Sequence, residues 1–125
     1  MTKPLSVRLG RGVRLHVDRD LFHDMLCDAA EGGSNYWASF RSLPGESRTD
    51  YRRLRLREHE RHAADALPVD RIVSAATMLR GFHRLALATF PARDAHMTNI
   101  LTGNTDAETA DVVLQMALFG DVIYG

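Results

Sequence analysis

The stretch Tyr51-Arg52-Arg53-Leu54-Arg55-Leu56-Arg57 decides the fold that we expect for this chain. Leucine and arginine alternate in it, and successive side chains of a β-strand point to opposite faces of a sheet. A strand with this pattern directs its leucines toward a core and its arginines toward solvent. The sequence therefore predicts a β-sheet with one covered face and one exposed, positively charged face.

The residues around this stretch predict the rest of a small antiparallel sheet. Tyr36 to Leu43 is rich in aromatic residues, which favour strands, and the turn-prone Pro44-Gly45-Glu46-Ser47 follows it. These two strands are expected to form an antiparallel hairpin. Val13 to Val17 alternates apolar and polar residues and predicts a third short strand. Residues 1–12, with one proline and two glycines, are expected to form an irregular arm.

Four helices are predicted from apolar residues at helical spacing and from capping residues at the ends of these segments. They are expected over about 21–30, 68–87, 94–103 and 107–118. Pro68 suits the first turn of the second helix, and Gly120 stops the last one. Val122 to Tyr124 predicts a short terminal strand or an extended tail. The expected fold class is α+β, with about four helices packed on a small antiparallel sheet of about three strands.

The composition fits one globular domain over residues 1–125. Hydrophobic residues make up 45% of the chain and charged residues 26%, which is typical of a folded protein. Lys and Arg together number 16, and so do Asp and Glu. A DNA mimic would be strongly acidic, and a general nucleic-acid binder is usually strongly basic. The zero net charge therefore argues against both classes.

Cysteine usage and hydropathy indicate a protein of the cell interior. Cys27 is the only cysteine, so no internal disulfide can form. The sequence has no apolar segment of the kind found in signal peptides, and none as long as a membrane span. We therefore expect a cytoplasmic location and no membrane partner.

Two segments resemble a known family. Glu31 to Trp37 resembles the pattern E-G-G-x-x-Y-W, and Ala107 to Gly125 resembles A-x-x-A-D-x-x-x-Q-x-A-L-F-G-x-x-x-Y-G. Together they are similar to a family of small uncharacterised proteins carried by bacteriophages, prophages and bacterial plasmids. The resemblance implies a mobile element in a bacterial host as the genetic setting, and it implies no activity or catalytic residue.

This resemblance, the small size and the lack of a catalytic signature favour a non-enzymatic accessory protein of a phage or mobile element. Such a protein would bind a host protein or protein complex in the bacterial cytoplasm. Inhibition of a defence system, as by an anti-CRISPR protein, is one form of this function. A nucleic-acid-binding module and a small enzyme or nucleotide-binding protein stay open as alternatives. No cofactor is expected, and the apolar C-terminal tail leaves a homodimer contact open.

The arginine-rich hairpin is the first candidate site. Its expected partner-binding residues are Arg41, Tyr51, Arg53, Arg55 and Arg57. Arginine makes planar, bidentate contacts with carboxylates and phosphates, and a tyrosine on the same face could stack on a base. The alternative interpretation is a solvated sheet face whose arginines pair with nearby acids such as Asp50, Glu58 and Glu60.

The segment before the predicted hairpin is the second candidate site. Its pocket residues would be Glu31, Gly32, Gly33, Tyr36 and Trp37. Paired glycines let a ligand approach the backbone, and the two aromatic rings could line a wall. The alternative is structural, because glycines also end helices and aromatic residues also fill cores.

The histidines do not predict a metal site. His59-Glu60-Arg61-His62 differs from the H-E-x-x-H zinc motif because its second histidine comes one residue early. No third ligand follows at a fixed spacing. No nucleophile elbow, phosphate loop or dinucleotide fingerprint is present either, so no catalytic residue is assigned.

Overall fold

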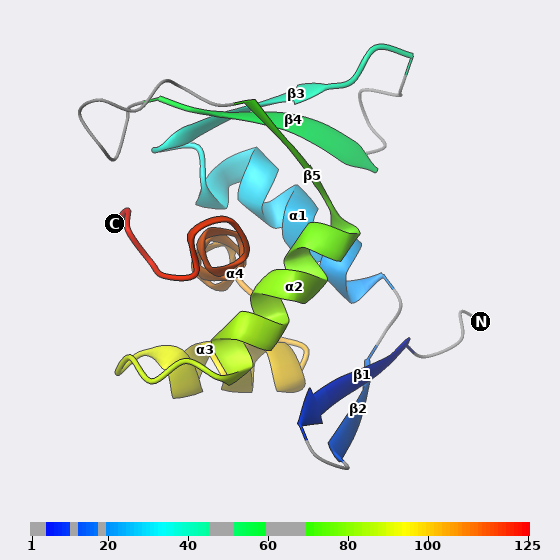
Figure 1. The fold of residues 1–125 in the computed structure, drawn as a ribbon, viewed down its shortest axis with the longest axis vertical. Coiled ribbons are helices and arrows are strands. Elements are labelled where there is room, and N and C mark those ends of the chain that lie inside the picture. The colour runs from blue at the N-terminus through cyan, green and yellow to red at the C-terminus, as the bar shows by residue number, and fades with distance from the viewer. Residues whose placement is uncertain (1–4, 11–12, 18–19, 46–51, 60–69) are drawn as a thin grey trace.

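A computed structural model describes residues 5–10, 13–17, 20–45, 52–59 and 70–125 of the chain. Four α-helices and two small antiparallel sheets make up this structure (Figure 1). The expected α+β class with about four helices is therefore confirmed. The strands are β1 (Leu5–Gly10), β2 (Val13–Val17), β3 (Ala38–Ser42), β4 (Arg53–Glu58) and β5 (Asp70–Ser74). The helices are α1 (Leu21–Asp28), continued by a π-helical segment (Ala29–Gly33), then α2 (Ala75–Ala86), α3 (Arg93–Leu101) and α4 (Ala107–Phe119).

The larger sheet has the order β3-β4-β5, with both neighbours antiparallel to the central β4. Along β4, exposed and buried residues alternate, as the leucine–arginine pattern predicts. Leu54 and Leu56 point inward, where they join Val73 of β5 in the hydrophobic core. Helices α1, α2 and α4 lie on this inner side of the sheet (Figure 1). The sheet therefore has one covered face and one face that no described helix covers.

Helix α4 lies at the centre of the hydrophobic core, and α1, α2 and α3 pack against it (Figure 1). Nine consecutive residues of α4, Thr109 to Ala117, are buried. Both ends of this helix follow the sequence prediction, because Asp106 accepts a hydrogen bond from the Thr109 amide and Gly120 adopts a left-handed conformation with φ of 72°. None of the helices in the described ranges is both long and apolar enough to cross a bilayer.

The expected irregular arm at residues 1–12 is wrong for its described part. Leu5–Gly10 forms β1, which pairs antiparallel with β2 in a hairpin of its own (Figure 1). The buried side chain of Val7 anchors this strand to the hydrophobic core. An irregularity in the pairing lies between Arg8 and Gly10. Proline and glycine obscured a short apolar alternation, Leu5, Val7 and Leu9, that is typical of a strand.

The start predicted for the second helix is also wrong. Asp70–Ser74 forms β5, and α2 begins only at Ala75. The β-branched Ile72 and Val73 suit a strand, and Ser74 with Thr77 forms a capping box that sets the start of the helix. The apolar stripe matched a helix because Val73 and the residues of α2 contact the same core. Pro68 lies outside the described residues.

Candidate functional site

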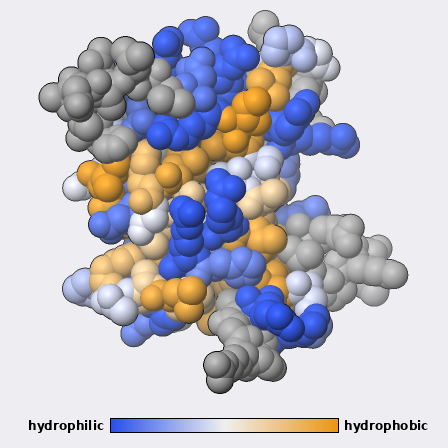
Figure 2. Space-filling view, viewed as in Figure 1, coloured by the Kyte–Doolittle hydropathy of each residue, from blue (hydrophilic) through white to orange (hydrophobic). Residues whose placement is uncertain are grey.

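The outer face of β3-β4-β5 carries the arginines that the sequence singled out. Arg53, Arg55 and Arg57 alternate with buried residues along β4 and are all exposed. Arg41 of β3 is exposed and lies directly opposite Arg55. Hydrophilic residues gather at the edge of the molecule that this sheet forms (Figure 2). We call Arg41, Arg53, Arg55 and Arg57 the arginine face. Tyr51 lies outside the described residues.

Two guanidinium groups are placed against each other in this face. Arg41 and Arg55 are register partners on adjacent strands, and like charges in that position destabilise a sheet. On the other side, Arg55 faces Ile72 of β5, which is 59% exposed. Neither Arg41 nor Arg55 has an ion-pair partner within the described ranges. The opposition of these two like charges lowers the stability of the free protein.

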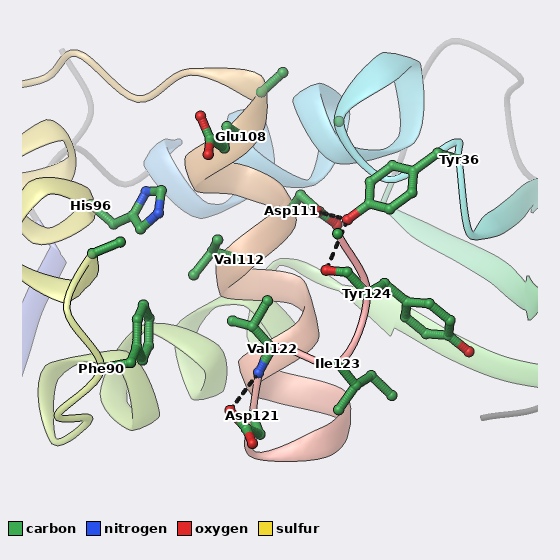
Figure 3. Close-up of a pocket in the computed structure, with 14 residues that line it drawn as sticks. Tyr36, Phe90, His96, Glu108, Asp111, Val112, Asp121, Val122, Ile123 and Tyr124 are labelled. Carbon is green, nitrogen blue, oxygen red and sulfur yellow. Dashed lines mark hydrogen bonds between the residues drawn. The ribbon is translucent and has the colours of Figure 1, made fainter. Parts of the chain in front are cut away.

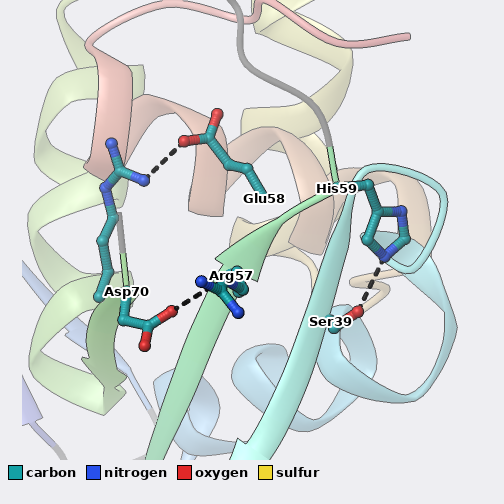
Figure 4. A network of polar contacts seen from close by, with 6 residues as sticks. Ser39, Arg57, Glu58, His59 and Asp70 are labelled. Atoms are coloured by element: carbon teal, nitrogen blue, oxygen red, sulfur yellow. Dashed lines mark hydrogen bonds and ion pairs between the residues drawn. The ribbon is translucent and has the colours of Figure 1, made fainter. Parts of the chain in front are cut away.

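Two acids of the described strands lie near the arginine face. Arg57 and Asp70 form an ion pair at 3.4 Å, with side chains 64% and 47% exposed, and such solvated pairs contribute little to stability. Glu58, named in the sequence as a local partner, points to the inner face and pairs with Arg71 at 2.7 Å instead (Figure 4). Asp50 and Glu60 lie outside the described residues. A shallow cavity of about 220 Å³ lies over Arg41, Arg55 and Arg57.

The second candidate segment folds against α4 around the carboxyl group of Asp111. This side chain is 6% exposed. Its Oδ1 accepts hydrogen bonds from Ser34 Oγ and Trp37 Nε1, both at 2.7 Å. Its Oδ2 accepts from Tyr36 at 2.6 Å and from Gln115 Nε2 at 3.1 Å. We call these five residues the Asp111 network. Four donors fill the acceptor capacity of one carboxylate, which identifies a structural role for Asp111.

Gln115 extends the Asp111 network to the C-terminal tail. Its Oε1 accepts hydrogen bonds from the amides of Ile123 at 2.9 Å and Tyr124 at 2.8 Å. The ring of Tyr124 stacks on Trp37 with 4.9 Å between centroids and 7° between planes, and its hydroxyl donates to Glu58 at 2.6 Å. The tail is therefore extended, as one of the two sequence predictions stated, and side chains hold it between α4 and the sheet.

The two segments that the sequence analysis singled out, Glu31 to Trp37 and Ala107 to Gly125, contact each other through this network. Tyr36 and Trp37 belong to the first segment, and Asp111, Gln115 and Tyr124 belong to the second. In space these residues form one set of hydrogen bonds and ring contacts. Gly33 is part of the same fit, because a Cβ placed there would lie 2.3 Å from the carbonyl oxygen of Ala107. Packing between distant parts of the chain therefore joins the two segments.

Burial and the hydrogen bond to Asp111 raise the pKa of Tyr36 to about 12. Because this value lies well above neutral pH, the phenol keeps its proton. Its O–H group donates a hydrogen bond to the carboxylate of Asp111. Cys27 shows a shift in the same direction: burial raises the pKa of its thiol, and the carboxylates of Glu31 and Asp24 raise it further. The Sγ of Cys27 lies 3.7 Å from Nε2 of His23. A nucleophilic cysteine has a lowered thiol pKa, whereas the thiol pKa of Cys27 is raised.

A groove of about 720 Å³ runs beside α4. We call it the α4 groove; Tyr36, Phe90, His96, Glu108, Val112 and Val122 are among the residues that line it (Figure 3). Of the pocket residues expected from the sequence, Gly33 and Tyr36 line this groove. Trp37 is buried beneath the tail, and Glu31 and Gly32 are exposed outside the groove. The structure thus brings only part of the predicted pocket together.

The histidines of the sequence form no metal centre in the described part of the chain, where no three His, Cys, Asp or Glu side chains converge on a common point. His59 instead contacts Ser39, with 2.9 Å between Nε2 and Oγ (Figure 4). His62 falls outside the described ranges.

Sequence reasoning missed Asp111 and Gln115, although a signal was present. They are polar residues four positions apart in the mostly apolar body of the helix. Residues at i and i+4 share a helix face, and buried polar groups require partners. Comparison with known proteins adds no relative, because no family model, no curated protein and no solved structure matches this chain.

Proposed function

We propose that this protein is a non-enzymatic binding protein that holds an acidic surface of a partner protein on its arginine face. The observation that carries the proposal is the opposition of Arg41 and Arg55 on adjacent strands. Two guanidinium groups side by side on an exposed sheet face cost stability in the free protein. They match a pair of carboxylates on a partner, since arginine binds carboxylates in a bidentate manner.

The neighbours of these arginines favour a protein partner over nucleic acid. Ile72 is 59% exposed beside Arg55, and an apolar side chain within a polar rim is typical of protein interfaces. The chain has a net charge of zero, so it lacks the excess of positive charge that non-specific nucleic-acid binding uses.

The resemblance to phage and plasmid proteins supplies the setting of this proposal. It implies that the partner is a protein or complex of a bacterial host. A component of a defence system, as for an anti-CRISPR protein, is the form of the proposal that this setting favours. The residues of the arginine face define the chemistry of the partner, an acidic surface, and they do not identify it by name.

A double charge reversal tests the proposal. Tagged wild-type protein and Arg41→Glu/Arg55→Glu should be compared by capture from a bacterial lysate, with Arg80→Glu as the matched control. Arg80 is an exposed arginine on α2, outside the sheet. We expect the captured partner to bind the double variant about tenfold or more weakly, which is about 1.4 kcal/mol or more. Equal capture by all three proteins would reject the arginine face as the binding surface.

Salt dependence separates the proposal from nucleic-acid binding. If phosphates were neutralised, the logarithm of the affinity would fall linearly and steeply with the logarithm of the salt concentration. We expect no shift of a labelled DNA or RNA duplex by the wild-type protein at low salt. A shift that disappears in the double variant would assign the arginine face to nucleic acid instead.

A further inference from the structure

The α4 groove holds polar groups that neither the Asp111 network nor the arginine face uses. His96, 7% exposed, extends from α3 toward α4 and lies between Glu108 and Val112 (Figure 3). Phe90, Val112 and Val122 supply apolar walls. A pocket of this size, mainly apolar with a few polar groups, is typical of ligand sites.

The hydrogen bonds of His96 fix which ring nitrogen carries the proton. Its Nδ1 lies 2.9 Å from Thr109 Oγ1, and the same hydroxyl oxygen accepts a hydrogen bond from Asn99 Nδ2 at 3.1 Å. Thr109 is fully buried, so its hydroxyl proton needs an acceptor. Within the described chain His96 Nδ1 is the acceptor available to it. With Asn99 Nδ2 as donor to this hydroxyl, we infer the neutral tautomer that carries its proton on Nε2.

This tautomer leaves a hydrogen-bond donor in the α4 groove. Nε2 of His96 has no hydrogen-bond partner among the residues that the structure describes, although the side chain is more than nine-tenths buried. Because His96 lines the groove, an acceptor that enters the groove from outside can reach this donor. A peptide carbonyl oxygen has the chemistry and size to fill that place.

The charge of the α4 groove is negative. Glu108 lies at one end of the groove and Asp121 at the other (Figure 3), and neither carboxylate has an ion-pair partner within the described ranges. None of the described lining residues is a lysine or an arginine. The two acids flank almost the whole of α4, and a helix of that length spans about 18 Å.

We propose that the α4 groove binds an extended basic peptide of about six residues from a partner protein. Six extended residues cover about 20 Å, which is close to the length of a 13-residue helix such as α4. Lysine or arginine side chains near the ends of the peptide would meet Glu108 and Asp121, and their aliphatic stems would lie on Val112 and Val122. A main-chain carbonyl oxygen at the centre of the peptide would accept a hydrogen bond from the Nε2–H group of His96.

Calorimetric titration at low salt tests this inference with the peptide acetyl-Arg-Ala-Val-Ala-Val-Arg-amide. We expect binding to the wild-type protein and no binding of the matched peptide with glutamate in place of arginine. Glu108→Gln/Asp121→Asn should weaken binding about tenfold or more, and Asp24→Asn, a change of an exposed acid on α1, should leave it unchanged. No binding by the wild-type protein, or equal binding by the double variant, would overturn the inference. If 1,6-diaminohexane binds as tightly as the arginine peptide, the groove is a site for small amines, and the proposal of a peptide ligand is overturned.

Nitrogen-15 NMR of the histidines tests the tautomer separately. We expect the free protein to show His96 protonated on Nε2, and the arginine peptide to shift this resonance while leaving that of His83 on α2 unchanged. A proton on Nδ1, or a His96 signal that the bound peptide does not move, would contradict the proposed carbonyl contact. Neither measurement involves the arginine face, so the two proposals fail independently.

Discussion

The Asp111 network and the arginine face place polar side chains under opposite conditions. Asp111 is 6% exposed and accepts hydrogen bonds from four side chains. Arg55 is exposed and lies between another arginine and an isoleucine. A buried polar group that is fully satisfied by the same chain serves the fold, because its bonding capacity is used. An exposed charge set against a like charge serves the fold poorly, which is why we assign it to a partner.

Removal of the central carboxylate should have the largest effect on this contrast. Asp111→Ala removes the acceptor that Ser34 Oγ and Trp37 Nε1 share, while Tyr36 and Gln115 keep the carbonyl oxygen of Tyr124. Each buried donor that loses its partner costs about 1–3 kcal/mol. We expect the free energy of unfolding to fall by about 3 kcal/mol or more, as measured by urea denaturation followed through the fluorescence of Trp37. Asp111→Asn, which keeps one acceptor oxygen, should lose less. A loss of under about 1 kcal/mol for the alanine variant would show that the network is not structural.

The contact between the first segment and α4 should show a smaller but specific effect. Gly33→Ala would place a Cβ 2.3 Å from the Ala107 carbonyl oxygen, and overpacking of this kind costs about 1–3 kcal/mol. Gly32→Ala is the matched control, because nothing lies within 4 Å of a Cβ at that position. Thermal unfolding should separate the two variants by several degrees. Equal melting temperatures of the two variants would mean that the backbone at Ala107 can move away from the added Cβ at little energetic cost.

Reversal of one arginine should have the smallest effect on stability, and in the opposite direction. Arg55→Glu converts the opposed pair with Arg41 into an attractive one, so we expect a gain of about 0.2–1 kcal/mol in the free energy of unfolding. Chemical denaturation at low salt and at 1 M NaCl should show this gain shrinking with salt, because exposed charges are screened. Arg80→Glu should show no comparable gain. Destabilisation by Arg55→Glu would mean that the arginine contributes to the fold.

The parts of the fold that could be predicted are those with a complete local signal. Helix α4 has a capping aspartate, an apolar body and a terminal glycine, and its bounds agree with the prediction to within a residue. Strand β4 alternates without interruption, so its two faces were assigned correctly. Strand β5 was taken for the start of α2 because Ile72 and Val73 fit both periodicities, and only pairing with β4 decides between them.

The candidate sites were predicted less completely than the fold. The exposure of Arg53, Arg55 and Arg57 follows from alternation alone, whereas the position of Asp70 and Ile72 beside them depends on β5. Three of the four hydrogen bonds of Asp111 join residues 74 to 77 positions apart in the chain, a separation that no local pattern encodes. His96 gained significance only through Thr109 and Asn99, which lie on two different helices.

The strict alternation in β4 also protects the sheet against misfolding. A shift of one residue relative to β3 would exchange the two faces of the strand. Three guanidinium groups would then enter the core, and Leu54, Leu56 and Glu58 would turn outward. Because burial of unpaired cations is prohibitively unfavourable, this slipped state is excluded during folding. The same side chains that we propose to meet a partner therefore ensure that the strand finds only one alignment.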